Sequence, residues 1–295
     1  MRPYVLVAPL ILDLALWLGY QLSMKPLTDL MIRWLNTAPN ADASAIDQLD
    51  KIGSSSNLFM LLTVSMPSTM TRLGSGIIGS GATHAQTILP TWILIPAILG
   101  LLIGGIALGM AYLTLLGNIA HGGSISIRQF VPTSVMNALK FIGFILIGIG
   151  VMLLLLFPLI LISGVLLAFG ISIIPVTSAL LFLGMMWAFV LLYFAQDAIV
   201  ISNAGPARAM YMSYNLVRAY FWSCLGLIVV SMVIQIGTPL ALKVFTRSTW
   251  GMPLAFLVRA YVLTGLALAA LIFYRDRASA IRVPKADTRA ADHTS

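Results

Sequence analysis

The residues of this sequence that could carry chemistry are few, and their spacing gives them no obvious common site. Inside the long apolar stretches, the groups that could transfer a proton or bind an ion are Asp13, Gln196, Asp197, Gln235 and Arg259. Acid–base or metal chemistry needs such groups to converge on one point. Because these residues are widely separated along the chain, we predict no catalytic residues and expect a protein that is not an enzyme.

Metal-binding and cofactor-binding patterns are equally weak. The chain has no glutamate, its histidines (His84, His121 and His293) lack ligand spacing, and Cys224 is its single cysteine. Residues 74–79 match Gly-x-Gly-x-x-Gly, but a dinucleotide site needs a strand before that loop, and no predicted strand precedes it. We interpret the glycine-rich stretch as a flexible loop. No metal and no cofactor is predicted.

Asp13 and Arg259 form the one candidate polar pair within the apolar stretches. Asp13 lies ten residues after Pro3 and Arg259 fifteen residues before Tyr274, which places them roughly 15 Å and 22 Å from the same membrane surface. Charged residues at such depth usually face the interior of a helical bundle, a cavity or each other. Two interpretations stay open. Either Asp13 meets Arg259 between adjacent helices, or Arg259 extends outward and Asp13 bonds a nearby Ser, Thr or Asn.

Composition identifies the elements that must hold these residues. Hydrophobic residues make up 60% of the chain and charged residues only 9%, whereas soluble proteins carry about 25% charged residues. The sequence is therefore that of an integral membrane protein. The net charge of +8 is explained by basic residues that flank spans and face anionic lipid. We expect the lipid bilayer as a partner and no nucleic acid, and we leave open a protein partner or a homo-oligomer.

The fold class follows from the length of the apolar runs, since about 20 residues cross the hydrocarbon core. We predict an all-α protein, a polytopic transmembrane helical bundle of about six spans with interfacial amphipathic helices. The whole of 1–277 is expected to be a single domain. The predicted spans are 3–22, 91–116, 141–169, 178–202, 219–240 and 251–274.

Residues outside these spans form one long region and one tail. Residues 23–89 are predicted to be extracytoplasmic, as a lid or on the membrane, with an amphipathic helix near 27–35. Residues 58–64 are apolar but too short to span, which predicts an interfacial or re-entrant segment. The polar stretch 278–295 predicts a disordered cytoplasmic tail. A signal peptide is the competing interpretation of 3–22, but no small-residue cleavage site follows directly.

The connector between the fourth and fifth spans predicts an interfacial helix over 205–220. Its apolar residues recur at helical spacing, with Arg208, Asn215 and Arg218 on the other side. We expect Met210, Tyr214 and Val217 to be buried and the arginines to lie near lipid headgroups. The alternative is that this helix packs on protein. The full set of predicted headgroup contacts is Arg208, Arg218, Arg275 and Arg277.

Glycines in the second span predict close helix packing. They form two pairs separated by three residues, the small-xxx-small pattern that lets helices approach closely in membranes. The competing interpretation is that glycine is simply common in membrane helices. The glycines concerned are Gly100, Gly104, Gly105 and Gly109.

Several motifs resemble one group of bacterial proteins. They are Asp197-Ala-Ile-Val, Gly205-Pro-x-Arg-Ala, Ser213-x-x-Leu-Val-Arg218, the opening around Pro9 and Asp13, and Phe273-Tyr-Arg-Asp-Arg277. Together they resemble uncharacterised bacterial polytopic membrane proteins similar to the membrane domain beside some glycerophosphodiester phosphodiesterases. The resemblance covers the first span and roughly 190–277. It implies a six-helix fold in the bacterial plasma membrane, and it implies no activity, because this chain lacks the carboxylates and clustered histidines of the phosphodiesterase site.

Three classes of function are compatible with these observations. We expect a non-enzymatic membrane module or accessory subunit that supports assembly, lipid organisation or a partner complex. The alternative is a transporter or permease component, which Asp13 and a kink expected at Pro158 would favour. No nucleotide-binding motif is present, so ATP-driven transport would need a separate ATPase. A membrane enzyme is the third class, and it lacks converging polar groups.

The distribution of lysine and arginine predicts that both termini are cytoplasmic. With this orientation, ten basic residues lie inside: Arg2, Arg128, Lys140, Arg208, Arg218, Arg275, Arg277, Arg282, Lys285 and Arg289. Six lie outside: Lys25, Arg33, Lys51, Arg72, Lys243 and Arg247. The excess favours the inside. A cytoplasm-active reporter fused to the C-terminus should be active, and activity of a periplasm-active reporter at that position would contradict the orientation.

Overall fold

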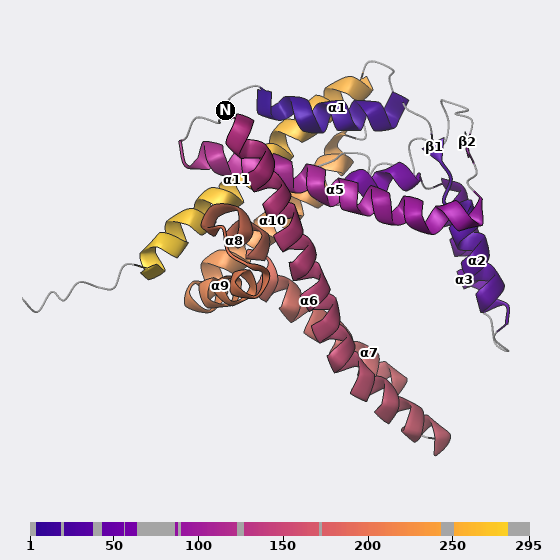
Figure 1. The fold of residues 1–295 in the computed structure, drawn as a ribbon. Coiled ribbons are helices and arrows are strands. Elements are labelled where there is room, and N and C mark those ends of the chain that lie inside the picture. The colour runs from indigo at the N-terminus through magenta and orange to yellow at the C-terminus, as the bar shows by residue number, and fades with distance from the viewer. Residues whose placement is uncertain are drawn as a thin grey trace, which may run out of the picture. The chain divides into compact units, whose positions relative to one another are not determined.

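The described part of the chain is almost entirely helical, as Figure 1 shows. The computed structural model describes residues 4–18, 21–37, 43–55, 57–63, 86–87, 90–122, 127–170, 173–242 and 251–282. Within these ranges, β1 (Gln21–Leu22) and β2 (Gln86–Thr87) form a two-residue parallel pair, and the other elements are helices. The all-α prediction is confirmed.

Five helical segments of the described chain are long and apolar enough to cross a membrane. They are Trp92–Ala120, Arg128–Ala168, Pro175–Ser202, Phe221–Leu242 and Pro253–Ala280. The first predicted span, 3–22, falls instead on α1 (Tyr4–Leu18), which has 15 residues. At about 1.5 Å per residue, α1 is about 22 Å long, shorter than the roughly 30 Å hydrocarbon core. The chain is thus a membrane-embedded helical protein, and a sixth span stays a prediction.

Several predicted boundaries differ from the structure, among them the start of the predicted tail 278–295, whose residues 278–282 belong to the helix α11 (Gly251–Arg282). The predicted span 141–169 and the residues before it form one helix, α6 (Ile127–Ala168), because the charged residue Lys140 does not end a helix. The predicted span 178–202 is divided into α7 (Ile174–Leu192) and α8 (Ala195–Ser202). The gap between the predicted spans 141–169 and 178–202 is shorter than expected: Gly170 has a φ of +79° and α7 already begins at Ile174.

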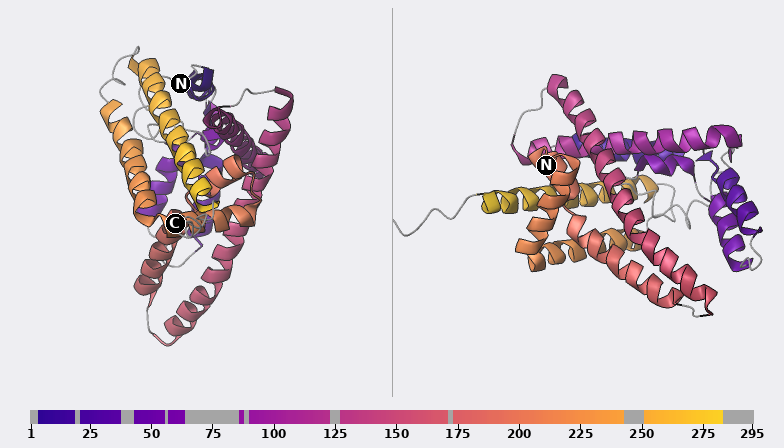
Figure 2. Two further views of the ribbon diagram at one scale, coloured as in Figure 1. Left: turned by 90° about the vertical axis from the view of Figure 1, so that its left-hand side faces the viewer. Right: turned by 60° about the horizontal axis from the view of Figure 1, so that its bottom comes forward.

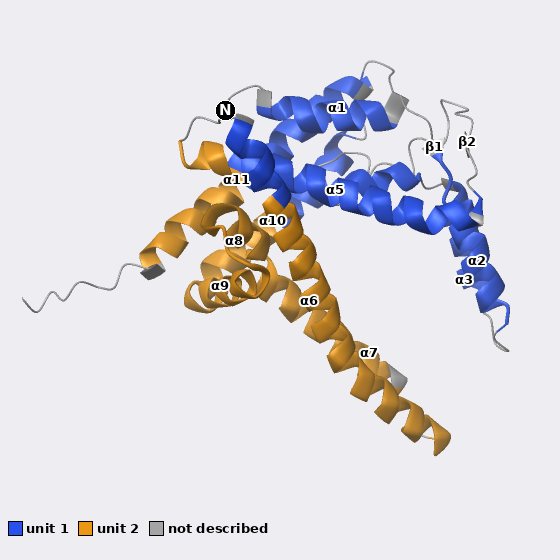
Figure 3. Ribbon diagram, viewed as in Figure 1, with its two compact units in different colours: residues 1–116, 126–135, 232–267 blue, residues 117–125, 136–231, 268–295 orange. Residues whose placement is uncertain are grey.

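The chain divides into two compact units (Figure 3). Unit 1 contains residues 1–116, 126–135 and 232–267, and unit 2 contains residues 117–125, 136–231 and 268–295. The helices α5 (Thr91–Ala120), α6, α10 (Phe221–Leu242) and α11 (Gly251–Arg282) each contribute residues to both units. The prediction of a single domain over 1–277 stays a prediction.

Unit 1 joins apolar helices to a small region of short elements. The Tyr112 hydroxyl of α5 lies 2.6 Å from the Thr264 hydroxyl of α11, and both side chains are buried. The short elements are α2 (Lys25–Leu35), α3 (Ala43–Ser55) and the 3₁₀ helix η1 (Leu58–Thr63), with α2 packed on α3. An exposed ion pair joins Lys51 to Asp47 along α3. The hydrogen bond to Asp47 and the negative charge of Asp47 raise the pKa of Lys51.

Unit 2 contains a helical hairpin and a corner. Figures 1 and 2 show the hairpin formed by α6 and α7. Most of its apolar side chains are exposed. One hydroxyl pair, Ser163 with Thr177 at 3.0 Å, joins its two helices. The corner is formed by α8 and α9 (Pro206–Ala219), which packs on α7 and α8. An apolar helix exposed all round is typical of lipid contact.

Candidate functional site

The corner between α8 and α9 begins with a chain reversal at Asn203. This residue has φ 50° and ψ 30°, the left-handed conformation that asparagine adopts more readily than most residues. Gly205 is then extended and Pro206 begins α9, where its missing N–H is not needed. The sequence Asn-Ala-Gly-Pro therefore ends one helix and starts the next, as predicted for this stretch.

Side chains from elsewhere in unit 2 donate to the C-terminal ends of three helices. The Lys140 ammonium donates to the Asn203 carbonyl at 3.0 Å and also to the Asn203 side-chain oxygen. The Ser213 hydroxyl donates to the Leu191 carbonyl of α7 at 2.7 Å. The Arg275 guanidinium donates to the Ala120 carbonyl of α5. The last carbonyls of a helix lack partners within it, so these side chains complete the helix ends.

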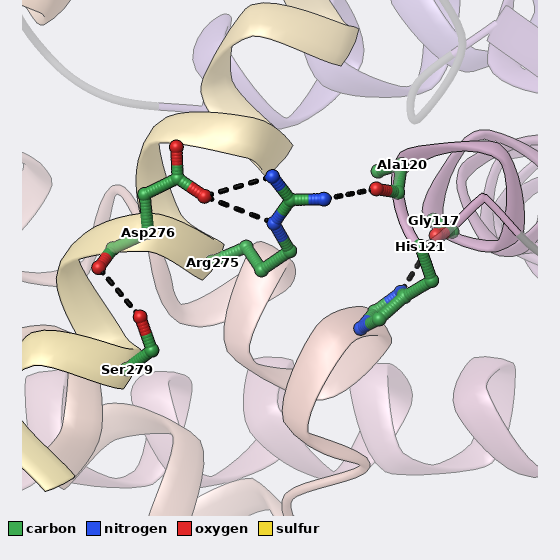
Figure 4. A network of polar contacts seen from close by, with 6 residues as sticks. All are labelled: Gly117, Ala120, His121, Arg275, Asp276 and Ser279. Atoms are coloured by element: carbon green, nitrogen blue, oxygen red, sulfur yellow. Dashed lines mark hydrogen bonds and ion pairs between the residues drawn. The ribbon is translucent and has the colours of Figure 1, made fainter. Parts of the chain in front are cut away.

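The C-terminal end of α5 holds the polar network in Figure 4. Besides Ala120, Arg275 binds a carboxylate oxygen of Asp276 through Nε and Nη2, each at 2.9 Å. His121 lies 2.8 Å from the Gly117 carbonyl through Nδ1. Of the four predicted headgroup arginines, Arg275 is thus held by protein groups. Arg277 lies over the rings of Tyr220 and Phe273, at 4.8 Å and 5.8 Å from their centroids.

The buried face of α9 differs from the predicted one. Its buried residues are Ala209, Ser213, Leu216 and Val217. Val217 belonged to the predicted face, but Met210 is only half-buried, and Tyr214 is 42% exposed. The side of α9 that packs on α7 carries the small residues Ala209 and Ser213. Their size lets the two helices approach closely enough for the Ser213 hydroxyl to bond the Leu191 carbonyl.

The opposite face of α9 carries aromatic and basic residues. Tyr211 is 66% exposed, and Arg208 and Arg218 are also exposed. At 100° per residue, Tyr211, Tyr214 and Arg218 project within about 60° of one another. The alternative that α9 packs on protein thus holds for one side of the helix, and a tyrosine–arginine face remains on the other. We call Arg208, Tyr211, Tyr214 and Arg218 the α9 outer face.

The predicted packing glycines do not behave alike. A Cβ added at Gly105 would overlap the backbone of η1, at 2.9 Å from the Leu62 Cα. At Gly104 it would make an ordinary contact of 3.5 Å with the Leu62 side chain, and at Gly100 it would meet no described atom within 4 Å. Gly109 is buried. Gly105 therefore packs closely, against η1 and not against another long helix.

Two close approaches in unit 2 were not predicted. A Cβ at Gly117 would lie 2.6 Å from the Val200 side chain of α8, and one at Gly143 would lie 2.9 Å from the ring of Pro206. Neither glycine belongs to a small-xxx-small pair with another glycine in the sequence. Because a lone glycine carries no pattern, only the tertiary contact identifies these two positions.

Asp13 and Arg259 are both buried in unit 1, with 0% and 2% of their surfaces exposed. Figures 1 and 2 show α1, which carries Asp13, alongside the first half of α11, which carries Arg259. The pairing of the two side chains stays a prediction, supported by their common burial. Among the described residues, no three His, Cys, Asp or Glu side chains are grouped as a metal site requires.

Comparisons with protein-family models, with curated proteins and with solved structures find no match to this chain. The resemblance to the membrane domain beside glycerophosphodiester phosphodiesterases therefore stays an expectation from the sequence motifs. The corner that carries most of these motifs is nevertheless a well-defined structural feature.

We expect the reversal at Asn203 to depend on its backbone conformation. Asn203→Val should lower the melting temperature in detergent by several degrees, because a β-branched residue in the left-handed region costs roughly 1–2 kcal/mol. Asn203→Gly keeps the conformation and loses only the side-chain contact to Lys140, so it should cost less. Equal losses from the two changes would contradict the conformational explanation.

We expect Asp13 and Arg259 to be energetically coupled. Asp13→Asn alone should destabilise the protein by about 3 kcal/mol, because it leaves a buried Arg259 without its counter-charge. Adding Arg259→Gln should recover part of that loss. A detergent melting series of both single variants and the double variant measures the coupling. Additive losses would show that the two side chains do not interact.

Proposed function

We propose that this chain is a non-enzymatic integral membrane protein, a membrane module or accessory subunit, whose α9 outer face contacts an anionic lipid surface. Five apolar helices long enough to cross a membrane support the first part. The second part rests on one observation. The packed side of α9 uses small and aliphatic residues, and the opposite side exposes two tyrosines and two arginines.

The chemistry of the α9 outer face suits a membrane surface. Tyrosine is enriched where the hydrocarbon meets the headgroups, because its ring is apolar and its hydroxyl is polar. Each arginine near an anionic leaflet contributes about 1 kcal/mol of attraction. The α9 helix joins α8 to α10, two segments that belong to candidate spans. A connector between two spans lies at the membrane surface, which places its outer face where headgroups are available.

The orientation in the cell is part of the same proposal. With the excess of basic residues inside, α9 lies at the cytoplasmic side of a bacterial plasma membrane, and both termini are cytoplasmic. The cytoplasmic leaflet carries anionic lipid. The arginines of α9 would therefore face lipid of opposite charge.

We expect Arg208→Gln with Arg218→Gln to weaken binding of phosphatidylglycerol by the detergent-purified protein. The loss should be on the order of tenfold, since two contacts of about 1 kcal/mol are removed and detergent already weakens them. Native mass spectrometry with added phosphatidylglycerol or phosphatidylcholine measures the bound lipid. Binding of the zwitterionic lipid should not change.

The matched control is Lys25→Gln with Arg33→Gln, which removes the same number of charges from exposed positions on α2. This control should keep nearly full phosphatidylglycerol binding. Equal losses in both double variants would show a general effect of net charge and would contradict a lipid site on α9. A loss of an associated protein with unchanged lipid binding would assign the α9 outer face to a protein partner.

The second candidate function is a transporter or permease component. The observation that favours it is the burial of Asp13 and Arg259 within apolar helices of unit 1, since ionisable groups in spans often line substrate or proton paths. Solute or proton flux through proteoliposomes of the purified chain, abolished by Asp13→Asn, would replace the first proposal. A transporter driven by ATP would in addition need a separate ATPase.

A further inference from the structure

We propose that residues 57–63 are a re-entrant segment that enters the hydrocarbon region and ends against the middle of α5. The segment consists of Asn57 and η1, and its sequence after Asn57 is Leu-Phe-Met-Leu-Leu-Thr. This inference does not depend on the proposed function of α9. It concerns unit 1 and adds a membrane-embedded element that is too short to cross.

The backbone of η1 lies directly against α5. The backbone of Leu61 and Leu62 occupies the space where a side chain at Gly105 would lie, with the Leu62 Cα at 2.9 Å from an added Cβ. Only a glycine permits so close an approach of two backbones. Gly105 is buried, and Leu58 at the start of η1 is completely buried. The segment is therefore seated on α5.

The position of Gly105 along α5 gives the depth of this contact. The helix runs from Thr91 to Ala120, so Gly105 is its fifteenth residue of thirty. Trp92 near the start is 79% exposed, as expected of an aromatic residue at the membrane interface. Gly105 is thirteen residues further on, or about 20 Å along the helix, which lies well inside the roughly 30 Å hydrocarbon core.

The end of α1 gives an independent measure of depth. A helix of 15 residues that starts at one surface ends about 8 Å short of the other side of the hydrocarbon core. The strand β1 follows α1 closely and is bound to the start of η1. The Leu22 N–H donates to the Asn57 side-chain oxygen at 3.0 Å, and Ser23 forms a bridge with Asn57. The position of Gly105 along α5 and the length of α1 thus both place this segment below the membrane surface.

Several polar groups of the segment have hydrogen-bond partners within the protein, as a low-dielectric environment requires. Irregular backbone is tolerated at membrane depth only where protein or a water-filled cavity surrounds it. The Asn57 side-chain oxygen also accepts from the Phe59 N–H at 3.1 Å, and the Thr63 hydroxyl donates to the Met60 carbonyl at 2.7 Å. Asn57 and Thr63 are both buried. At each end of the segment, a side chain of the segment itself thus pairs with a backbone group.

Cysteine labelling tests the proposal, because the chain has a single cysteine, Cys224, that is buried and can be replaced. In a Cys224→Ala background, Met60→Cys should react at least tenfold more slowly with a membrane-impermeant maleimide than Ser54→Cys, which lies on an exposed turn of α3. The protein is reconstituted in liposomes and labelled from both sides. Equal reaction rates at the two positions would overturn the proposal.

The glycine contact has a matched control on the same helix. Gly105→Ala should displace η1 and raise labelling at Met60→Cys by several-fold. Gly100→Ala adds the same methyl group where no described atom lies within 4 Å, so it should change nothing. Equal labelling in the two alanine variants would show that η1 is not seated at Gly105.

A depth measurement covers the case in which Gly105→Ala fails to fold. A fluorophore attached to Met60→Cys in the Cys224→Ala background, with Gly105 kept, is quenched by nitroxides placed on lipid headgroups or deep on acyl chains. We expect the acyl-chain nitroxide to quench more strongly. Stronger quenching by the headgroup nitroxide would place the segment at the membrane surface and would overturn the proposal.

Discussion

The packing of unit 2 depends on one constraint, the need of the carbonyl groups at helix ends for hydrogen-bond donors. Hydrocarbon offers no hydrogen bonds, so a helix that ends in or near it must find donors for its last carbonyls within the protein. Lys140, Ser213 and Arg275 supply these donors to the ends of α8, α7 and α5. Each donor comes from a different helix, so completing the helix ends also fixes how α5, α6, α9 and α11 meet in this unit.

Small residues are the second requirement of the same packing. Polar side chains such as Ser213 reach a neighbouring carbonyl only if the helices approach closely, and close approach requires the absence of side chains at the crossing. Gly117 faces Val200 and Gly143 faces Pro206 within unit 2, and Gly105 faces η1 within unit 1. Replacing a glycine at such a crossing would separate the donor from its carbonyl, so packing and hydrogen bonding depend on each other.

Contacts with protein groups also determine which arginines are left for the candidate lipid surface. Arginines that follow the last span could all reach headgroups on sequence grounds, but Arg275 is engaged by Ala120 and Asp276, and Arg277 lies over two aromatic rings. Arg208 and Arg218 remain exposed on α9 beside Tyr211 and Tyr214. Protein contacts on one side of α9 thus select which residues are left to contact the membrane on the other.

The sequence by itself determined the membrane class, the helical fold, the helix break around Asn203 to Pro206 and the amphipathic α9, because apolar run length and helix-breaking residues are local properties. It could not locate the start of α6 at Ile127, since Lys140 looks like a span boundary until Asn203 is brought beside it. It also could not choose the buried face of α9, distinguish Gly105 from Gly100, or identify Gly117 and Gly143. Those features depend on which distant backbone approaches each residue, and only the tertiary structure decides that approach.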